Sequence, residues 1–465
     1  MIAAPFYTLT KDIYVSFALA NTLITLVVLF LIIRVMKQLG TTNKNAVMAC
    51  NLILIPYSFG MLDYYNMLFF NGSQYVIRII IILTLFSLIL CDKERRLRPI
   101  NIVLGVMEMA LIVIAAIASG AYILLVCLLP MILVMVLNVL IQGRFGIYDK
   151  YQYIVCGVSL VLAVIGLVIN HRLEVAMIGN SMSLLRWYDF RYYLGAVTEG
   201  YFQLFGAMPG AVEDESVAVL SVRGISFLIR MVISIVVIVT FVKSLKNIIF
   251  AGKDVADSET RVVDPRFYLY GMAFINFTII MVCETRYNST NNIMPNRYML
   301  PAVIPVLMGI PIYLDEWKLK WSKYLENVVS MFIVAGIALV CIMGYKDAKD
   351  SIPAYGYCDQ ILDYLDQTDY DDVVFGNDRV TTEICRAKDL NRNYVSYLPD
   401  GYMDVVDFYT AQWSGSYYND HHMLWLIQGN NIDEYLGPYK ASFYSYYDSF
   451  LWFDIFVSDT FVLVE

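Results

Sequence analysis

The chain has few charged residues and very little histidine. Charged residues make up 16% of its 465 residues, against about 25% in ordinary soluble proteins. Three histidines and eight scattered cysteines argue against a Cys/His metal cluster. The 33 basic and 41 acidic residues give a formal net charge of −8, which argues against nucleic acid as a partner. No glycine-rich phosphate loop and no Ser/His/Asp constellation is present.

The chain is instead rich in apolar residues, which form 59% of it. A single soluble core cannot bury so much apolar surface, whereas lipid can accommodate it. Apolar runs of nearly membrane-spanning length, of which the second and ninth are short, occur at residues 13–34, 47–62, 75–91, 100–118, 121–141, 153–170, 224–243, 267–284, 299–314 and 327–345. We therefore predict a polytopic α-helical membrane protein with about ten transmembrane helices within residues 1–345.

Basic residues accumulate in alternate connections between these runs. The five basic connections carry Arg34, Lys37 and Lys44; Lys93, Arg95, Arg96 and Arg98; Arg144 and Lys150; Lys243, Lys246, Lys253, Arg261 and Arg266; and Lys318, Lys320 and Lys323. The positive-inside rule places all five in the cytoplasm. Both termini are then extracytoplasmic, and we predict an integral, multi-pass protein of the plasma (cytoplasmic) membrane.

Residues 346–465 form an acidic, tyrosine-rich tail on the predicted outer side. Helical spacing marks residues 357–367 and 381–388, and strand-like runs occur at 372–376, 394–398 and 460–464. The strand–helix–strand order favours a parallel pair of strands, so we predict a small C-terminal α/β extracytoplasmic domain. Its aromatic cluster at 443–452 resembles a sugar-stacking surface, although core or interface packing is the favoured interpretation. Cys358 and Cys385 are candidates for a disulfide, with separate thiols favoured.

Polar and aromatic residues gather in the predicted outer connections. An arginine at the hydrocarbon boundary pairs with an anion or reaches the headgroups, and its planar fork suits a phosphate. A carboxylate at the same place can take a proton from an acceptor hydroxyl. The candidates are Asp63, Tyr64, Tyr65, Arg78, Arg186, Arg191, Glu284, Arg286, Tyr287, Arg297 and Tyr298. The alternative is that these arginines and tyrosines anchor helix ends at the interface.

Three stretches of the chain carry a resemblance to a known family. They are the opening Ala4-Pro5-Phe6-Tyr7 to Lys11-Asp12, the segment Asn296-Arg297-Tyr298-Met299-Leu300-Pro301-Ala302, and the order of elements in the tail. With this layout the chain resembles the GT-C superfamily of membrane glycosyltransferases, in particular the bacterial members that take sugars from polyprenyl-phosphate donors. The opening is similar to the end of the family's first outer loop, so the resemblance begins after the family's first helix and first outer loop.

The resemblance implies an inverting, single-displacement transfer at the outer face of the membrane. The partners would be membrane lipid, a polyprenyl-phosphate sugar and a glycan, lipid or protein acceptor of the cell envelope. Arg286 and Arg297 would bind the donor phosphate, with Tyr287 and Tyr298 at the rim of the pocket. Arg186, Arg191, Arg78, Tyr64 and Tyr65 are secondary candidates for substrate binding.

The family's catalytic carboxylate usually lies in the first outer loop, and no residue of this chain matches it. Asp63 and Glu284 are the remaining candidates for that role. No cofactor is specified by the sequence, and a divalent cation is compatible with a phosphate site.

Two other classes of function stay open. A glycan or lipid transporter keeps charged residues within its spans, along a path through the membrane. Arg230 is the main charge that we place within a span, which favours a one-sided enzyme over a conduit. The missing first loop is equally compatible with an inactive, truncated membrane scaffold or binding protein.

Overall fold

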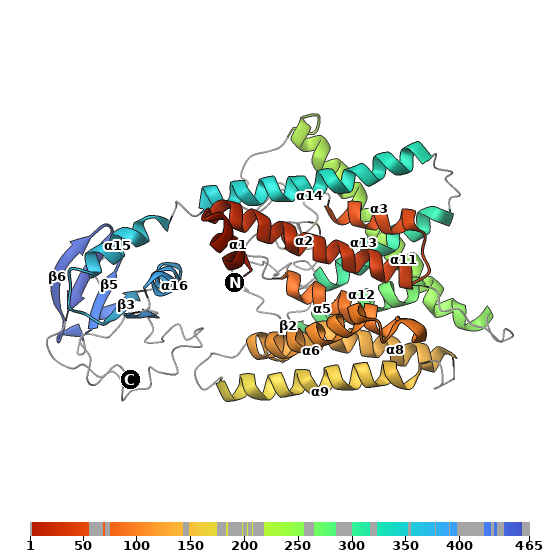
Figure 1. Ribbon diagram of the computed structural model, residues 1–465, viewed down its shortest axis with the longest axis horizontal. Coiled ribbons are helices and arrows are strands. Elements are labelled where there is room, and N and C mark those ends of the chain that lie inside the picture. The colour runs from red at the N-terminus through yellow and green to blue at the C-terminus, as the bar shows by residue number, and fades with distance from the viewer. Residues whose placement is uncertain are drawn as a thin grey trace. The chain divides into compact units, whose positions relative to one another are not determined.

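The chain forms mainly helices, with one small sheet near its C-terminal end (Figure 1). The computed structural model describes residues 2–54, 68–69, 75–142, 148–173, 183–184, 198, 202, 207, 218–254, 265–284, 300–316, 323–351, 355–376, 378–389, 391–397, 423–428, 432–434 and 441–457. The contacts divide the chain into a helical unit, residues 1–170 and 180–348, and a C-terminal unit, residues 171–179 and 349–465.

The helical unit contains helices that are long and apolar enough to cross a membrane. In the described part of the chain there are five of them, at Ile13–Gln38, Pro99–Ser119, Ala121–Leu140, Lys150–Arg172 and Asn327–Lys349. Four predicted runs form shorter apolar helices, at Val76–Ile89, Gly224–Thr240, Phe267–Ile279 and Leu300–Ile312. These helices are consistent with a membrane protein, while the count of ten spans stays a prediction.

The helical unit is built from two groups of helices, separated by the long connection between residues 173 and 222. Those before the long loop are α1 (Ala3–Thr10), α2 (Ile13–Gln38), α3 (Asn43–Leu54), α5 (Val76–Ile89), the 3₁₀ turn η2 (Lys93–Arg95), α6 (Pro99–Ser119), α7 (Ala121–Ile123), the π-helical segment η3 (Leu124–Leu128), α8 (Leu129–Gln142) and α9 (Lys150–Leu173). Those after it are α11 (Val222–Asp254), α12 (Pro265–Val282), α13 (Leu300–Glu316) and α14 (Lys323–Ser351). The Asp12 carboxylate caps α2, accepting hydrogen bonds from the backbone N–H groups of Tyr14 and Val15.

The shorter helices form the centre of this unit. Most residues of α5 and of residues 300–312 of α13 are buried. Helix α5 packs against α2 and α6, and α13 packs against α12 and α3. Gly309 permits close packing of α13 on α12, because a Cβ there would lie 2.4 Å from the Tyr270 hydroxyl oxygen. By contrast, only 11% of the apolar stretch of α14 is buried, against 56% for α2. The exposed apolar faces of α9 and α14 are suited to contact with lipid.

Side chains near the predicted cytoplasmic ends of the helices join several elements. Arg34 of α2 donates to Ser87 of α5 and to Asn101 of α6. Arg96 forms an ion pair of 2.6 Å with Asp149 and lies 4.3 Å from the centre of the Tyr151 ring. Arg34 and Arg96 therefore connect elements of the bundle, in addition to marking the predicted cytoplasmic side.

The C-terminal unit contains a five-stranded mixed sheet. Its elements are α15 (Tyr357–Leu365), β3 (Asp372–Gly376), α16 (Arg379–Lys388), β4 (Asn393–Tyr397), β5 (Met423–Ile427), β6 (Ser445–Phe450) and β7 (Phe453–Val457). The strand order is β4-β3-β5-β7-β6. Strand β3 pairs in parallel with both β4 and β5, and β7 pairs antiparallel with β5 and β6. The predicted parallel pair is confirmed, whereas the predicted strand at 460–464 lies outside the described residues.

Alternate residues of β3 supply two separate apolar layers. Val373 and Phe375 pack with Cys358 and other side chains of the two helices, while Val374 packs with Trp425 on the other side of the sheet. This alternation is the period-2 geometry of a strand that is covered on both faces. Cys358 and Cys385 are free thiols, fully buried in the first layer.

Candidate functional site

Most of the predicted site residues lie outside the described part of the chain. This group consists of Asp63, Tyr64, Tyr65, Arg186, Arg191, Arg286, Tyr287, Arg297 and Tyr298. For Glu284 the backbone is described, and for Arg78 the side chain is described as well. Two further stretches also lie outside the described residues: the aromatic stretch 413–418, which resembles a sugar-stacking surface, and Asp420, His421 and His422, side chains that can ligate a metal.

A short ribbon joins two of the predicted outer connections. Strand β1 (Ser183–Leu184) pairs antiparallel with β2 (Cys283–Glu284), with Ser183 opposite Glu284. Strand β2 directly continues α12. The Ser183–Leu184 backbone is therefore held beside the end of α12.

Arg78 lies under aromatic rings within the helical unit. Its guanidinium carbon is 4.1 Å from the centre of the Tyr122 ring and 4.9 Å from that of Tyr75. Contacts of this kind stabilise a cation away from water. Arg78 is thus a fixed positive charge between α5 and α7, rather than a side chain extended along the membrane surface.

A buried acid in α6 is absent from the residues that we predict from the sequence. Glu108 is 0% exposed, and none of the described residues donates a hydrogen bond to either of its carboxyl oxygens. It belongs to the inward-facing stripe of α6, formed by Asn101, Leu104, Glu108, Ile112, Ala115 and Ala116. The interpretation of Arg230 as the main charge within a span was therefore incomplete. The signal was visible: an acidic residue stands near the middle of a 21-residue apolar helix.

Arg78 and Glu108 lie at a similar depth in the bundle. At a rise of 1.5 Å per residue, Arg78 is about 16 Å from the end of α5 at Ile89, and Glu108 is about 14 Å from the start of α6 at Pro99. These two ends are joined by a short connection, and α5 and α6 pack together.

The backbone beside these residues departs from the ordinary α-helix. Cys127 belongs to the π-helical segment η3, between α7 and α8, and its thiol donates to the Arg78 carbonyl oxygen at 3.9 Å. The Asn276 side chain of α12 donates to the Val126 carbonyl oxygen at 2.7 Å. Single π turns inside α-helices are frequently found at functional sites.

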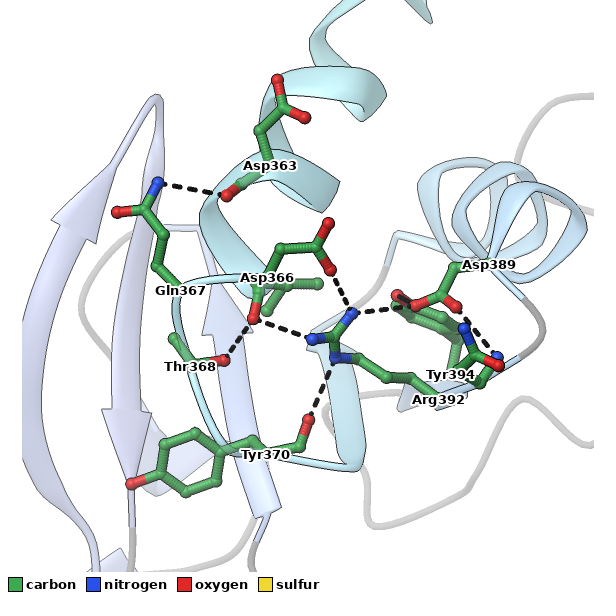
Figure 2. A network of polar contacts seen from close by, with 10 residues as sticks. Asp363, Asp366, Gln367, Thr368, Tyr370, Asp389, Arg392 and Tyr394 are labelled. Carbon is green, nitrogen blue, oxygen red and sulfur yellow. Dashed lines mark hydrogen bonds and ion pairs between the residues drawn. The ribbon is translucent and has the colours of Figure 1, made fainter.

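The C-terminal unit has a polar network centred on Arg392 (Figure 2). The guanidinium donates to Asp366 at 2.8 Å and to Asp389 at 3.0 Å. It also donates to the backbone carbonyl oxygens of Leu365 at 3.0 Å and Tyr370 at 3.2 Å. This network joins the end of α15 to the loop before β4 and has the saturated geometry of a structural contact.

The same unit exposes aromatic side chains along its edge strand β6. Tyr446, Tyr447 and Trp452 are each about half exposed, and the Phe450 ring stacks on Tyr364 with centroids 4.7 Å apart. The Tyr364 hydroxyl donates to Asp448 at 3.2 Å. The cluster at 443–452, for which core or interface packing was the favoured interpretation, therefore lies largely at the surface of this unit.

No metal site is indicated by the described residues, among which no three His, Cys, Asp or Glu side chains gather as ligands. The geometry thus offers three features: the β1–β2 ribbon, the buried Glu108 and Arg78, and the aromatic strand β6. Comparison with known proteins gives no match to a family model, to a curated protein or to a solved structure.

Proposed function

We propose that the chain is a membrane glycosyltransferase that moves a sugar from a polyprenyl-phosphate donor to a glycan, lipid or protein acceptor outside the plasma membrane. The observation that carries this proposal is the β1–β2 ribbon, which pairs Ser183 with Glu284. It brings together two connections that both contain arginine, and a phosphate is best held by guanidinium groups that approach it from different segments.

In the proposed reaction, an acceptor hydroxyl oxygen attacks the anomeric carbon of the donor sugar. The bond between that carbon and the phosphate oxygen breaks, and the polyprenyl phosphate leaves as an anion next to Arg286 and Arg297. Glu284 or Asp63 takes the proton of the acceptor hydroxyl. Arginines placed where the negative charge develops lower the barrier electrostatically.

The exposed aromatic strand of the C-terminal unit supports a glycan as the acceptor. Rings such as Trp452 and Tyr446 present flat apolar faces on which the C–H face of a sugar can pack. The Asp448 carboxylate accepts a hydrogen bond from the Tyr364 hydroxyl, and such an acceptor also suits sugar hydroxyl groups.

The proposal is tested with membranes that contain the full chain and a set of polyprenyl-phosphate glucose, mannose and galactose donors, each radiolabelled in the sugar. We expect Arg297→Ala to lower transfer at limiting donor about thirty-fold, the equivalent of about 2 kcal/mol for a charged hydrogen bond. The matched control is Arg95→Ala, which removes an exposed arginine on the predicted cytoplasmic side. Unchanged transfer by Arg297→Ala would remove that residue from the donor site.

A transporter of lipid-linked glycans is the second candidate, and the observation that favours it is the buried Glu108. Ionisable groups at mid-depth mark transport paths in many membrane proteins. The same labelled donors separate the two functions. The enzyme breaks the bond between sugar and phosphate, whereas a transporter moves the intact lipid-linked sugar to the other leaflet of a proteoliposome.

A further inference from the structure

The edge hairpin of the C-terminal unit ends in two exposed apolar side chains. Strands β6 and β7 are joined by the two-residue turn Leu451–Trp452, which lies between the paired residues Phe450 and Phe453. Leu451 is 44% exposed and Trp452 is 48% exposed. Residues 450–453 include no charged side chain. Two adjacent apolar side chains at one tip differ from the single apolar residues that are scattered over an ordinary surface.

The backbone of this turn is unfavourable for a leucine. Leu451 has a φ of 57°, in the left-handed region that glycine and asparagine adopt easily and that a bulky side chain avoids. Two-residue hairpin turns normally have glycine, asparagine or aspartate at such a position. The leucine therefore costs free energy within the hairpin, and a strained residue of this kind points to a role of its side chain outside the hairpin.

Contacts with α15 show where the tip lies within the C-terminal unit. The Phe450 ring stacks on Tyr364, near the end of α15, and the Trp452 ring lies 4.7 Å from the ring of Tyr357, the first residue of that helix. Tyr357 and Tyr364 are about 10 Å apart along the helix axis. The β6–β7 turn therefore lies beside the start of α15.

The start of α15 follows a predicted membrane span closely along the chain. The apolar stretch of α14 ends at Lys349, and α15 begins at Tyr357. Even when fully extended, the chain between these two residues reaches no further than about 28 Å. Tyr355 belongs to this connection, and its ring lies 6.2 Å from that of Tyr357. The rings of Tyr355, Tyr357 and Trp452 thus form one row at the end of the unit to which the span is attached.

We propose that Leu451 and Trp452 form a membrane contact, through which the C-terminal unit binds the lipid headgroup region beside the end of α14. Tryptophan and tyrosine are enriched at this level of a bilayer, where the ring lies among apolar groups and its N–H or hydroxyl group reaches water. The Leu451 side chain enters the boundary between headgroups and acyl chains, and its burial there offsets the strain of the turn. This contact does not depend on the proposed transfer reaction.

A sugar is the competing ligand for the Trp452 ring. Lipid is favoured at the tip because the adjacent side chain is a leucine, which offers a sugar neither a flat ring nor a hydrogen-bonding group. The Tyr446 ring contacts Phe456, which belongs to the Trp425 layer on the other face of the sheet. The use of Tyr446 by a glycan is therefore separate from the lipid contact at the tip.

The experiment uses the full chain in nanodiscs of phosphatidylcholine and phosphatidylglycerol, without any glycan. The nanodiscs include a phospholipid that carries a photoreactive diazirine close to its glycerol backbone. After illumination, mass spectrometry of peptides locates the lipid adducts. We expect adducts on residues 450–453, and adducts on α14 serve as the internal reference.

The test variant combines Leu451→Gly with Trp452→Asn. It should lose the adducts at the tip, while the hairpin should still form because the turn now has residues that it favours. Hydrogen exchange of peptides from β5 and β7, equal to that of the wild type, checks that the sheet is intact. The matched control is Tyr447→Ser, which removes an exposed ring of the same strand away from the turn and should keep the tip adducts.

Two results would overturn the proposal. One is a wild-type protein that is labelled on α14 but not on residues 450–453, as expected for a tip that binds only a sugar or a second copy of the chain. The other is equal labelling of the tip in the wild type and in the double variant, because the lipid contact would then not depend on Leu451 and Trp452.

Discussion

Arg392 in the C-terminal unit and Glu108 in the helical unit are both ionisable residues with little exposure to solvent, yet their surroundings differ. The Arg392 guanidinium has two carboxylates and two backbone carbonyl oxygens as acceptors (Figure 2). Glu108 has no donor among the described residues. The first arrangement compensates the loss of hydration and the second does not.

This difference separates a structural charge from a functional one. A buried ion with all its partners stabilises one conformation, and its removal leaves those partners uncompensated. A buried acid without partners has no such contacts to lose when it is replaced by a neutral side chain of the same shape. Variants at the two sites should therefore differ in their effect on stability, with a large loss at Arg392 and little change at Glu108.

The largest effect is expected for Arg392→Ala. The change leaves Asp389, whose side chain is 12% exposed, without its cation. Breaking such a pair costs about 3 kcal/mol. Urea unfolding of the full chain, followed by pulse labelling of the buried Cys358 and Cys385 thiols, measures the stability of this unit.

Lys388→Ala is the matched control for this prediction. Lys388 pairs with Asp359, but both side chains are largely exposed, so the loss should be no more than about 0.5 kcal/mol. Equal unfolding midpoints for the two variants would contradict the structural role of the Arg392 network.

A smaller effect is expected when the acid partner of Arg392 is titrated. Burial alone raises the pKa of Asp389, but hydrogen bonds from the Asn391 backbone N–H, the Tyr394 hydroxyl and Arg392 outweigh it and hold the pKa below its usual range. The unfolded chain has a value of about 3.9. The stabilisation is therefore complete above that value and is lost as the pH falls through the lower pKa of the folded state.

We expect acid to destabilise the C-terminal unit of the wild type more than that of Asp389→Asn, by about 1 kcal/mol. Samples equilibrated in urea at each pH are read by a brief hydrogen-exchange pulse at one fixed pH, followed on peptides from α16 and β4. If the stability of the C-terminal unit fell equally in the wild type and in Asp389→Asn below about pH 4, the acid sensitivity would come from other carboxyl groups.

Much of the fold follows from local pattern. The apolar runs at 13–34 and 100–118 form long helices, and residues 372–376 form β3, because hydrophobic length and strand-like runs are local signals. Strand β6 was not predicted, since its tyrosines are exposed at an edge. Its place in the sheet depends on pairing with β7, a contact that composition alone does not reveal.

The candidate site was less accessible to sequence reasoning. Arginines in loops suggest a phosphate site by their chemistry, but which loops lie together depends on long-range pairing such as that of Ser183 with Glu284. Glu108 was not predicted as a site residue, although it lies within the apolar run at 100–118. Its burial depends on how α6 packs against α5 and α9, which a hydropathy pattern does not specify.

The smallest effect is expected for Glu108→Gln, and it completes the comparison with Arg392. A neutral carboxylic acid and an amide have nearly the same shape, so the helical unit should keep its stability to within about 1 kcal/mol. An ionised, paired Glu108 would instead make the change cost about 3 kcal/mol or more, as at Arg392. Thermal unfolding of the full chain distinguishes a neutral Glu108 from an ionised, paired one. The readout is the labelling of the Cys50 and Cys127 thiols, which are buried in the folded protein. A melting temperature that falls as far as that of Arg392→Ala would mean that Glu108 is a structural charge, and the contrast between the two units would disappear.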